Sequence, residues 1–340
     1  MNFVPCIRWS GGKRKQSEEI ISKMPTKMGT FFIPFLGGGS VMFQLINSNI
    51  KYDRIVASDI YQPLMGIWDL IKNDPDALIS SYTEMYAELE DRGEEYYDEV
   101  VDEFNSQEFG NQSPILFHFI TRACMRGSIE FDKKGNFSTK MQAPGSGNSV
   151  DRIASPHIVE GIIKRWSECI QEVEFRCESY EQTVAEAQSG DFCFFDPPYI
   201  DGTWYRDNNI DMDMFYDCLR NLPCDYSITL NGDRDIYPIP EYCYTKHEYV
   251  YYGVKKTKSG RPTGSRDSLW MKKTDEYEYD DAGRNIRQNA RGQGGKIPQI
   301  NDLKVIADIQ KQIDNTNDRI NKVDDKLDAI INLLSRGSNG

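Results

Sequence analysis

The sequence predicts an α/β protein with an open, mostly parallel sheet, and three short apolar segments carry this prediction. Residues 30–36, 55–59 and 192–195 are rich in aliphatic and aromatic side chains. Each run stops at glycine, at an acid or just before proline, as buried strands do where the chain leaves a sheet. Open α/β sheets bind ligands at the carboxyl ends of their strands. The residues that end or follow these runs therefore form the candidate site.

The first two segments predict a site for a nucleoside-bearing cofactor. Gly37, Gly38 and Gly39 follow the first run and precede a helix-like stretch at 42–47. A strand, a glycine turn and a helix start let a ligand approach free backbone N–H groups closely. The second run ends in Asp59, where α/β nucleoside sites place the acid that binds ribose hydroxyls. A dehydrogenase would fit these two elements equally well.

The third segment leads into Asp196, Pro197, Pro198 and Tyr199. The prolines fix φ and supply no N–H, so the Asp196 carboxylate and nearby carbonyls form a rim of acceptors that suits a donor group. An exocyclic amino group of a nucleobase is such a donor, and Tyr199 offers it a stacking face. Plain turn chemistry is the alternative for an Asp-Pro pair that ends a strand.

In their order and spacing, these segments resemble the Dam-type DNA adenine-N6 methyltransferases, which use S-adenosylmethionine. The resemblance covers most of residues 8–273 and implies a Rossmann-like methyltransferase sheet. It rests on five motifs. They are the family's opening motif at 8–13, its cofactor loop at 34–41, its ribose acid at 58–60, its strand beside the cofactor adenine at 175–180 and its catalytic strand at 190–199.

The resemblance also implies the roles of individual residues. Catalysis is assigned to Asp196, Pro197, Pro198 and Tyr199. Cofactor contacts are assigned to Trp9, Gly11, Gly12, Lys13, Phe35, Gly37, Gly39, Ser40, Asp59, Ile60, Ser179, Tyr180 and Asp196.

The chemistry expected of these residues is direct methyl transfer. An adenine amino group is a poor nucleophile because its lone pair is delocalised into the ring. If Asp196 and the Pro197 carbonyl accept its two N–H groups, the lone pair is directed at the methyl donor, and positioning supplies most of the rate. The base must leave the duplex first, and Tyr199 would stack on it.

A long insertion at 62–170 is expected to be helical and to recognise the DNA target. The predicted DNA contacts are polar and mostly basic residues in two loop regions: Arg122, Arg126, Ser128, Glu130, Lys133, Lys134, Lys140, Lys255, Lys258 and Arg261. Glu130 stands where the family commonly has arginine, so a target other than GATC is expected. Ile33 stands where the family usually has an acid that contacts the methionyl ammonium.

Composition limits the remaining possibilities. The 340 residues carry a formal charge of −13, and the acids concentrate at 88–103 and 275–281, away from the basic loops. We therefore expect locally guided binding of double-stranded DNA rather than indiscriminate coating. The eight cysteines and three histidines lack metal-ligand spacing, which predicts a reduced, metal-free, cytoplasmic protein, bacterial or virus-encoded, without a membrane span.

The predicted domain organisation has four parts. Residues 1–61 and 171–274 form the catalytic domain, 62–170 the insertion, 275–300 a flexible linker and 301–336 a coiled coil. Apolar residues recur at three- and four-residue steps in the last part, which indicates a homo-oligomer through residues 303–334. An amphipathic helix folded back on the catalytic domain is the alternative.

Two other functions fit the sequence. Ile33 and the altered target loop would suit a catalytically idle, methyltransferase-like DNA-binding or scaffold protein multimerised by its coiled coil. The acceptor rim would also serve an enzyme that acts on cytosine N4 or on RNA, because it binds any amino donor beside a stackable ring. A restriction partner is compatible with the main prediction.

Overall fold

The computed structural model describes residues 4–108, 111–142, 153–198, 210–231, 239–256 and 262–272. These residues form a seven-stranded sheet with the order β3-β2-β1-β4-β5-β7-β6. Its strands are β1 Thr30–Ile33, β2 Arg54–Asp59, β3 Val173–Cys177, β4 Phe192–Phe195, β5 Asp225–Asn231, β6 Lys246–Lys256 and β7 Pro262–Lys272. The α/β fold predicted from the sequence is confirmed.

The sheet is parallel from β3 to β5, and β7 and β6 add an antiparallel edge. Strand β1 lies between β2 and β4, so the strand order reverses there. Such a reversal leaves a crevice beyond the carboxyl ends of the two strands, where open sheets bind their ligands. The sequence therefore brings its glycine turn and Asp196 to the same edge of the sheet.

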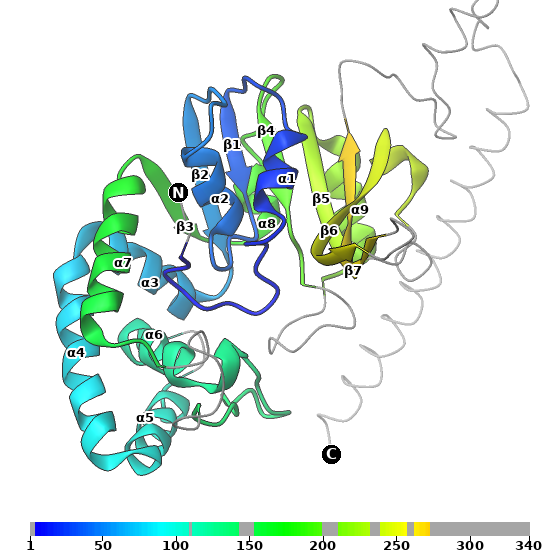
Figure 1. The fold of residues 1–340 in the computed structure, drawn as a ribbon. Helices are drawn as coiled ribbons and strands as arrows, with labels where there is room; N and C mark the ends of the chain where they lie inside the picture. Colours follow the sequence, from blue (N-terminus) through cyan, green and yellow to red (C-terminus); the bar gives the residue numbers. More distant parts are fainter. Residues whose placement is uncertain are drawn as a thin grey trace, which may run out of the picture. The chain divides into compact units, whose positions relative to one another are not determined.

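Helices cover both faces of the sheet (Figure 1). The described helices are α1 Ser17–Ser22, α2 Ser40–Ile46, α3 Gln62–Asn73, α4 Pro75–Arg92, α5 Glu94–Ser106, α6 Pro114–Ala123, α7 Pro156–Cys169, α8 Tyr180–Val184 and α9 Met212–Asn221. Side chains alternate along a strand, so Phe31 packs in the core with α1, α2, α3 and α7, whereas Phe32 packs in a second core with α8 and α9.

Helices α4, α5 and α6 lie to one side of the sheet (Figure 1), and the predicted insertion at 62–170 also contains α3 and α7. α6 packs against α3, and α4 packs against α7. Every described residue lies within one compact unit, Met1–Ile286. The division into a catalytic domain and a separate insertion stays a prediction.

The second compact unit, Arg287–Gly340, lies outside the described residues. The predicted linker, coiled coil and oligomer contacts at 303–334 fall there or in the undescribed stretch before it, and they stay predictions. No helix among the described residues is long and apolar enough to cross a membrane.

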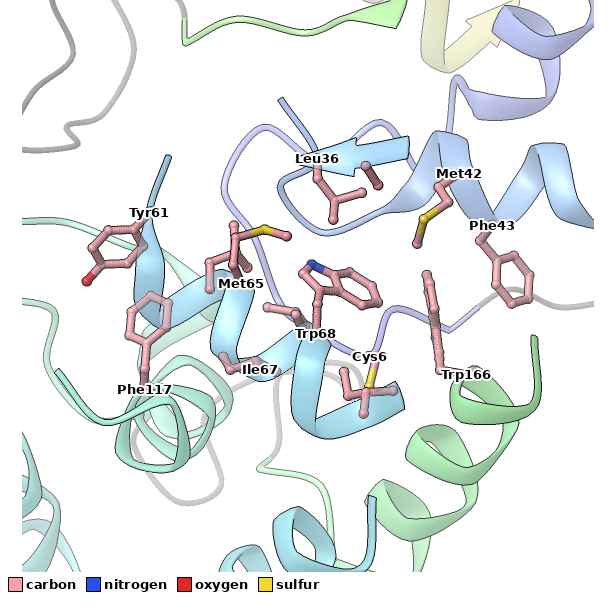
Figure 2. Close-up of a cluster of buried hydrophobic side chains, with 14 of the residues drawn as sticks. Cys6, Leu36, Met42, Phe43, Tyr61, Met65, Ile67, Trp68, Phe117 and Trp166 are labelled. Carbon is pink, nitrogen blue, oxygen red and sulfur yellow. The ribbon is translucent and has the colours of Figure 1, made fainter. Parts of the chain in front are cut away.

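Trp68 packs against the glycine turn at 37–39 and supports it. This residue of α3 is fully buried, and its indole Nε1 donates a hydrogen bond of 3.1 Å to the Gly37 carbonyl oxygen. Figure 2 shows its ring among Leu36, Met42 and Trp166. Gly39 has a φ of 67°, and a Cβ there would lie 2.8 Å from the Trp68 ring. Glycine is therefore required at position 39 both by its backbone and by its neighbour.

We predict that Gly39→Ala destabilises the protein. The left-handed backbone costs an L-residue roughly 1–3 kcal/mol, and the contact with Trp68 adds to that cost. Gly161→Ala is the matched control, because Gly161 lies in α7 and a Cβ added there would meet nothing within 4 Å; it should stabilise by about 0.5–1 kcal/mol. Urea unfolding measures both, and equal stabilities for the two variants would show that the turn can move away from Trp68.

Candidate active site

A cavity of about 580 Å³ lies at the carboxyl ends of β1, β2 and β4, which is within the range of small-molecule sites. Every residue predicted to contact the cofactor lines this cavity. They are Trp9, Gly11, Gly12, Lys13, Phe35, Gly37, Gly39, Ser40, Asp59, Ile60, Ser179, Tyr180 and Asp196. The fold thus brings together segments that are far apart in the sequence.

The segment at 9–13 lies against the glycine turn. A Cβ on Gly37 would lie 2.8 Å from the Trp9 ring, and one on Gly38 would lie 3.0 Å from the Trp9 Cβ. Trp9 also turns the chain, because its carbonyl accepts a hydrogen bond of 3.3 Å from the Gly12 N–H. The two glycine-containing segments therefore form adjacent walls of the cavity.

Asp59 ends β2 with both carboxylate oxygens held by the backbone. Its Oδ2 accepts a hydrogen bond from the Gly37 N–H at 3.1 Å, and its Oδ1 accepts one from the Tyr61 N–H at 3.2 Å. Burial raises the pKa of Asp59 to about 6, although these backbone hydrogen bonds act in the opposite direction. A carboxylate has about four lone-pair sites, so Asp59 can still accept a hydroxyl donor.

Apolar surfaces flank Asp59. Ile60 lines the cavity and is 74% exposed. On the other side, Phe35 and Tyr180 stack with ring centroids 5.5 Å apart. The predicted strand at 175–180 is β3, but it ends at Cys177, and Ser179 caps α8 through its side chain. The side chains of Ile60, Phe35 and Tyr180 could pack against a flat ring whose polar substituents contact Asp59.

Asp196 leaves β4 at the cavity and is held by two donors on one oxygen. Its Oδ1 forms an ion pair of 2.7 Å with Lys13 Nζ and accepts a hydrogen bond of 2.7 Å from Thr229 Oγ1. Lys13 is 4% exposed and Asp196 is 19% exposed. Pro197 and Pro198 also line the cavity, whereas Tyr199 lies outside the described residues.

The cavity is acidic. Among its described lining residues, five are acids and one, Lys13, is basic. The acids are Asp59, Glu178, Glu181, Asp196 and Asp211. Such a surface favours a ligand with positive charge and disfavours phosphate groups.

Sequence reasoning missed several residues of the site. Tyr61 and Phe131 line the cavity with ring centroids 5.9 Å apart, and Thr229 contacts Asp196. Tyr61 carries a weak sequence signal, since it follows Asp59 closely. Phe131 and Thr229 carry none, because only the fold brings the insertion and β5 to the cavity.

The predicted DNA contacts are only partly described. Lys133 and Lys134 are exposed in a tight turn between Phe131 and Phe137, which pair as an isolated bridge. Lys140 and Glu130 are exposed, and Ser128 Oγ donates a hydrogen bond of 2.9 Å to Glu130 Oε1. The side chains of Arg126, Lys255, Lys258 and Arg261 lie outside the described part of the chain.

Arg122 is a correction to the sequence prediction. It is 3% exposed, its Nη2 donates to the Cys6 carbonyl oxygen at 2.7 Å, and its Nε donates to His118 Nε2 at 3.1 Å. Burial and the Arg122 charge lower the pKa of His118 well below its ordinary value, so the neutral imidazole can accept this bond. Arg122 ties α6 to the Cys6 backbone and is buried away from the surface that DNA could reach.

The fold and site together define a member of a known enzyme family. Residues 9–220 match the model of the D12 class N6 adenine-specific DNA methyltransferases. The chain belongs to this family, and the resemblance inferred from its motifs is confirmed.

Curated relatives agree with this assignment. The chain is similar to the type II methyltransferase M.MjaIII of Methanocaldococcus jannaschii, with 27% identity over 58% of this chain and 70% of the relative. It is also similar to the DNA adenine methylase of Vibrio cholerae, with 28% identity over 57% of this chain and 64% of the relative. The type II methyltransferase M1.LlaDCHI of Lactococcus lactis is 28% identical over 59% of this chain and 67% of the relative.

We predict that Arg122→Met lowers stability, since it removes a buried group with two hydrogen-bond partners. The expected loss is about 1–3 kcal/mol in urea unfolding. Lys134→Ala is the paired variant: its exposed side chain should leave stability unchanged and reduce the salt dependence of DNA binding by about one unit of slope. Weaker DNA binding by a fully stable Arg122→Met protein would restore Arg122 as a DNA contact.

Proposed function

We propose that this protein transfers a methyl group from S-adenosylmethionine to the N6 amino group of an adenine flipped out of double-stranded DNA. The observation that carries the proposal is the position of Asp196, at the rim of a cavity that also contains Asp59 and the glycine turn. The family assignment names the base and the kind of reaction. The enzyme would act alone or beside a restriction enzyme, as the names of its type II relatives suggest.

The cavity fits S-adenosylmethionine in three respects. Asp59 keeps free lone pairs for the ribose hydroxyls. Ile60, Phe35 and Tyr180 line the cavity and offer an apolar slot for the adenine ring. The glycine turn at 37–39 and the segment at 9–13 enclose the remaining space. This cofactor would supply an electrophilic methyl group, whose bond to sulfur breaks with the electron pair left on sulfur.

The charge of the cavity argues against the dehydrogenase alternative. A dinucleotide carries a pyrophosphate, which needs positive charge or free N–H groups around it. Five acidic residues and a single lysine line the described cavity wall, and that lysine is already paired with Asp196. A donor that carries a sulfonium and an ammonium suits this surface better.

Asp196 would act as an acceptor for the adenine amino group. Among the described residues, both contacts to its carboxylate go to Oδ1, so Oδ2 is available for an N–H of the substrate. The Pro197 carbonyl would accept the second N–H, and Tyr199 would stack on the base. Fixed acceptors direct the lone pair without a covalent intermediate, and one amino proton leaves after the N–C bond has formed.

Ile33 makes the methionyl end of the site different from the family's usual pattern. It lies at the end of β1, is 2% exposed and lines the cavity. An ammonium group would therefore meet an apolar side chain here and must be held by backbone carbonyls or by another acid. Weak cofactor binding would favour the idle DNA-binding or scaffold alternative.

We predict that DNA from cells expressing this protein contains N6-methyladenine in one short sequence, and that Asp196→Asn strongly reduces the rate of this methylation. Asparagine keeps the shape but loses the charged acceptor, and losing one such contact costs about 10²–10³-fold in rate. Asp217→Asn, an exposed acid on α9, is the matched control. Modification-detecting sequencing of DNA and of RNA identifies the base.

The sequencing result distinguishes the proposed function from its alternatives. Modified cytosine N4 or modified RNA would move the enzyme to another acceptor. Unmodified nucleic acid with intact DNA binding would favour the idle protein. Methylation by Asp196→Asn at the parent rate would remove Asp196 from the mechanism.

We predict that S-adenosylhomocysteine binds more weakly as the pH falls below about 6. The pKa of Asp59 is raised to about 6 by burial, and ribose hydroxyls need the ionised acceptor. Protons therefore compete with the ligand, and the affinity at pH 5 should be about tenfold below that at pH 8. Calorimetric titration measures it. Asp59→Asn should bind weakly at every pH, and an unchanged profile in that variant would assign the titration to another group.

A further inference from the structure

A buried carboxylate, Asp267, accompanies the Lys13–Asp196 ion pair. It lies on β7, is 4% exposed, and its Oδ2 accepts a hydrogen bond of 2.9 Å from Gln16 Nε2. The register of β5 and β7 sets Leu269 opposite Thr229 and places Asp267 two residues along the strand from Leu269. Residues opposite one another, and residues two apart, share a face of a sheet, so Asp267 and Thr229 lie on the same face.

Asp267 lies near enough to the ion pair to be affected by both of its charges. Burial raises its pKa, the charge of Lys13 lowers it, and the charge of Asp196 raises it. Lys13 is thus paired with Asp196, which is 19% exposed, and is also attracted by the buried Asp267. A buried lysine needs one partner to offset the loss of its hydration, and here Asp196 already supplies that partner. Asp267 is therefore not needed to stabilise the buried Lys13 and can serve another role.

We infer that Asp267 is a positioning residue for methyl transfer: by sharing the charge of Lys13, it leaves Asp196 more negative toward the amino group and toward the cationic methyl donor. This inference rests on the proposed function. Lys13 with Asp196 alone would form a neutral pair. With Asp267 ionised, the three side chains carry one surplus negative charge in a poorly hydrated place, where charges act strongly on one another.

Two side chains position the carboxylate of Asp196. Thr229 Oγ1 and Lys13 Nζ hold its Oδ1 at 2.7 Å each and so fix the direction of Oδ2. Asp267 is not among the described residues that line the cavity, and it acts through Lys13. The effect of Asp267 should therefore be electrostatic. We expect the Asp267 charge to change the affinity for a ligand according to the ligand's charge rather than its shape.

The test compares two ligands that differ by one charge. S-adenosylmethionine carries a sulfonium, whereas S-adenosylhomocysteine has a neutral thioether. The relevant ratio is the affinity for S-adenosylmethionine divided by that for S-adenosylhomocysteine. We expect Asp267→Asn to lower this ratio by about three- to tenfold in calorimetric titrations, the effect of a unit charge that does not touch the ligand. Single-turnover methylation of DNA should slow by about tenfold, while the affinity for S-adenosylhomocysteine stays close to that of the parent.

Three variants separate charge from structure. Asp267→Thr removes the same charge with a side chain that suits a strand, so it replaces Asp267→Asn if that protein unfolds. Gln16→Met removes the hydrogen bond to Asp267 but keeps every charge, and it should leave the affinity ratio unchanged. Lys13→Met combined with Asp267→Asn should show non-additive effects on the ratio, because Asp267 acts through Lys13.

The outcomes distinguish this inference from the proposed function. An affinity ratio that is the same in the parent and in both Asp267 variants overturns the inference, as does an equal fall in Gln16→Met, which would make the role of Asp267 structural. A parent protein that binds neither ligand overturns the proposed function instead.

Discussion

The burial of Lys13 is the constraint on which the site depends. A lysine ammonium that is 4% exposed costs several kcal/mol in lost hydration unless acceptors surround it. The Gly11 carbonyl and the Asp196 carboxylate supply two of them, at 2.9 and 2.7 Å. These contacts fix the segment before α1 to the end of β4. One buried charge thereby holds two walls of the cavity together and fixes Oδ1 of Asp196.

The same segment joins the cavity to the predicted target loop. Ser10 Oγ accepts a hydrogen bond of 3.0 Å from the Ile129 N–H, and two residues later Phe131 packs on Tyr61 and lines the cavity. A ligand that rests against Tyr61 therefore also supports the base of the loop that presents Glu130 and the exposed lysines. Cofactor and DNA affinities are expected to be linked, and linkage of this kind acts in both directions.

Much of this fold follows from short-range signals in the sequence. The strand runs at 30–36, 55–59 and 192–195 end where β1, β2 and β4 meet the cavity, because apolar runs and turn residues report burial locally. The residues that escaped prediction depend on long-range packing. Thr229 reaches Asp196 only through the pairing of β4 with β5, and Arg122 looked like a surface cation although α6 buries it. Charge type alone does not reveal exposure.

The acidity of the protein, which at first argues against DNA binding, fits the proposed reaction. Acids around the cavity repel phosphate groups, so the DNA backbone must be held elsewhere, and the exposed Lys133 and Lys134 offer such a place. A flipped base is neutral and enters such a cavity without electrostatic cost, while a sulfonium donor is attracted to it. In the proposed reaction, the acidic cavity would thus admit the neutral base and the cationic methyl donor to Asp196 and would keep the phosphate groups of the DNA outside.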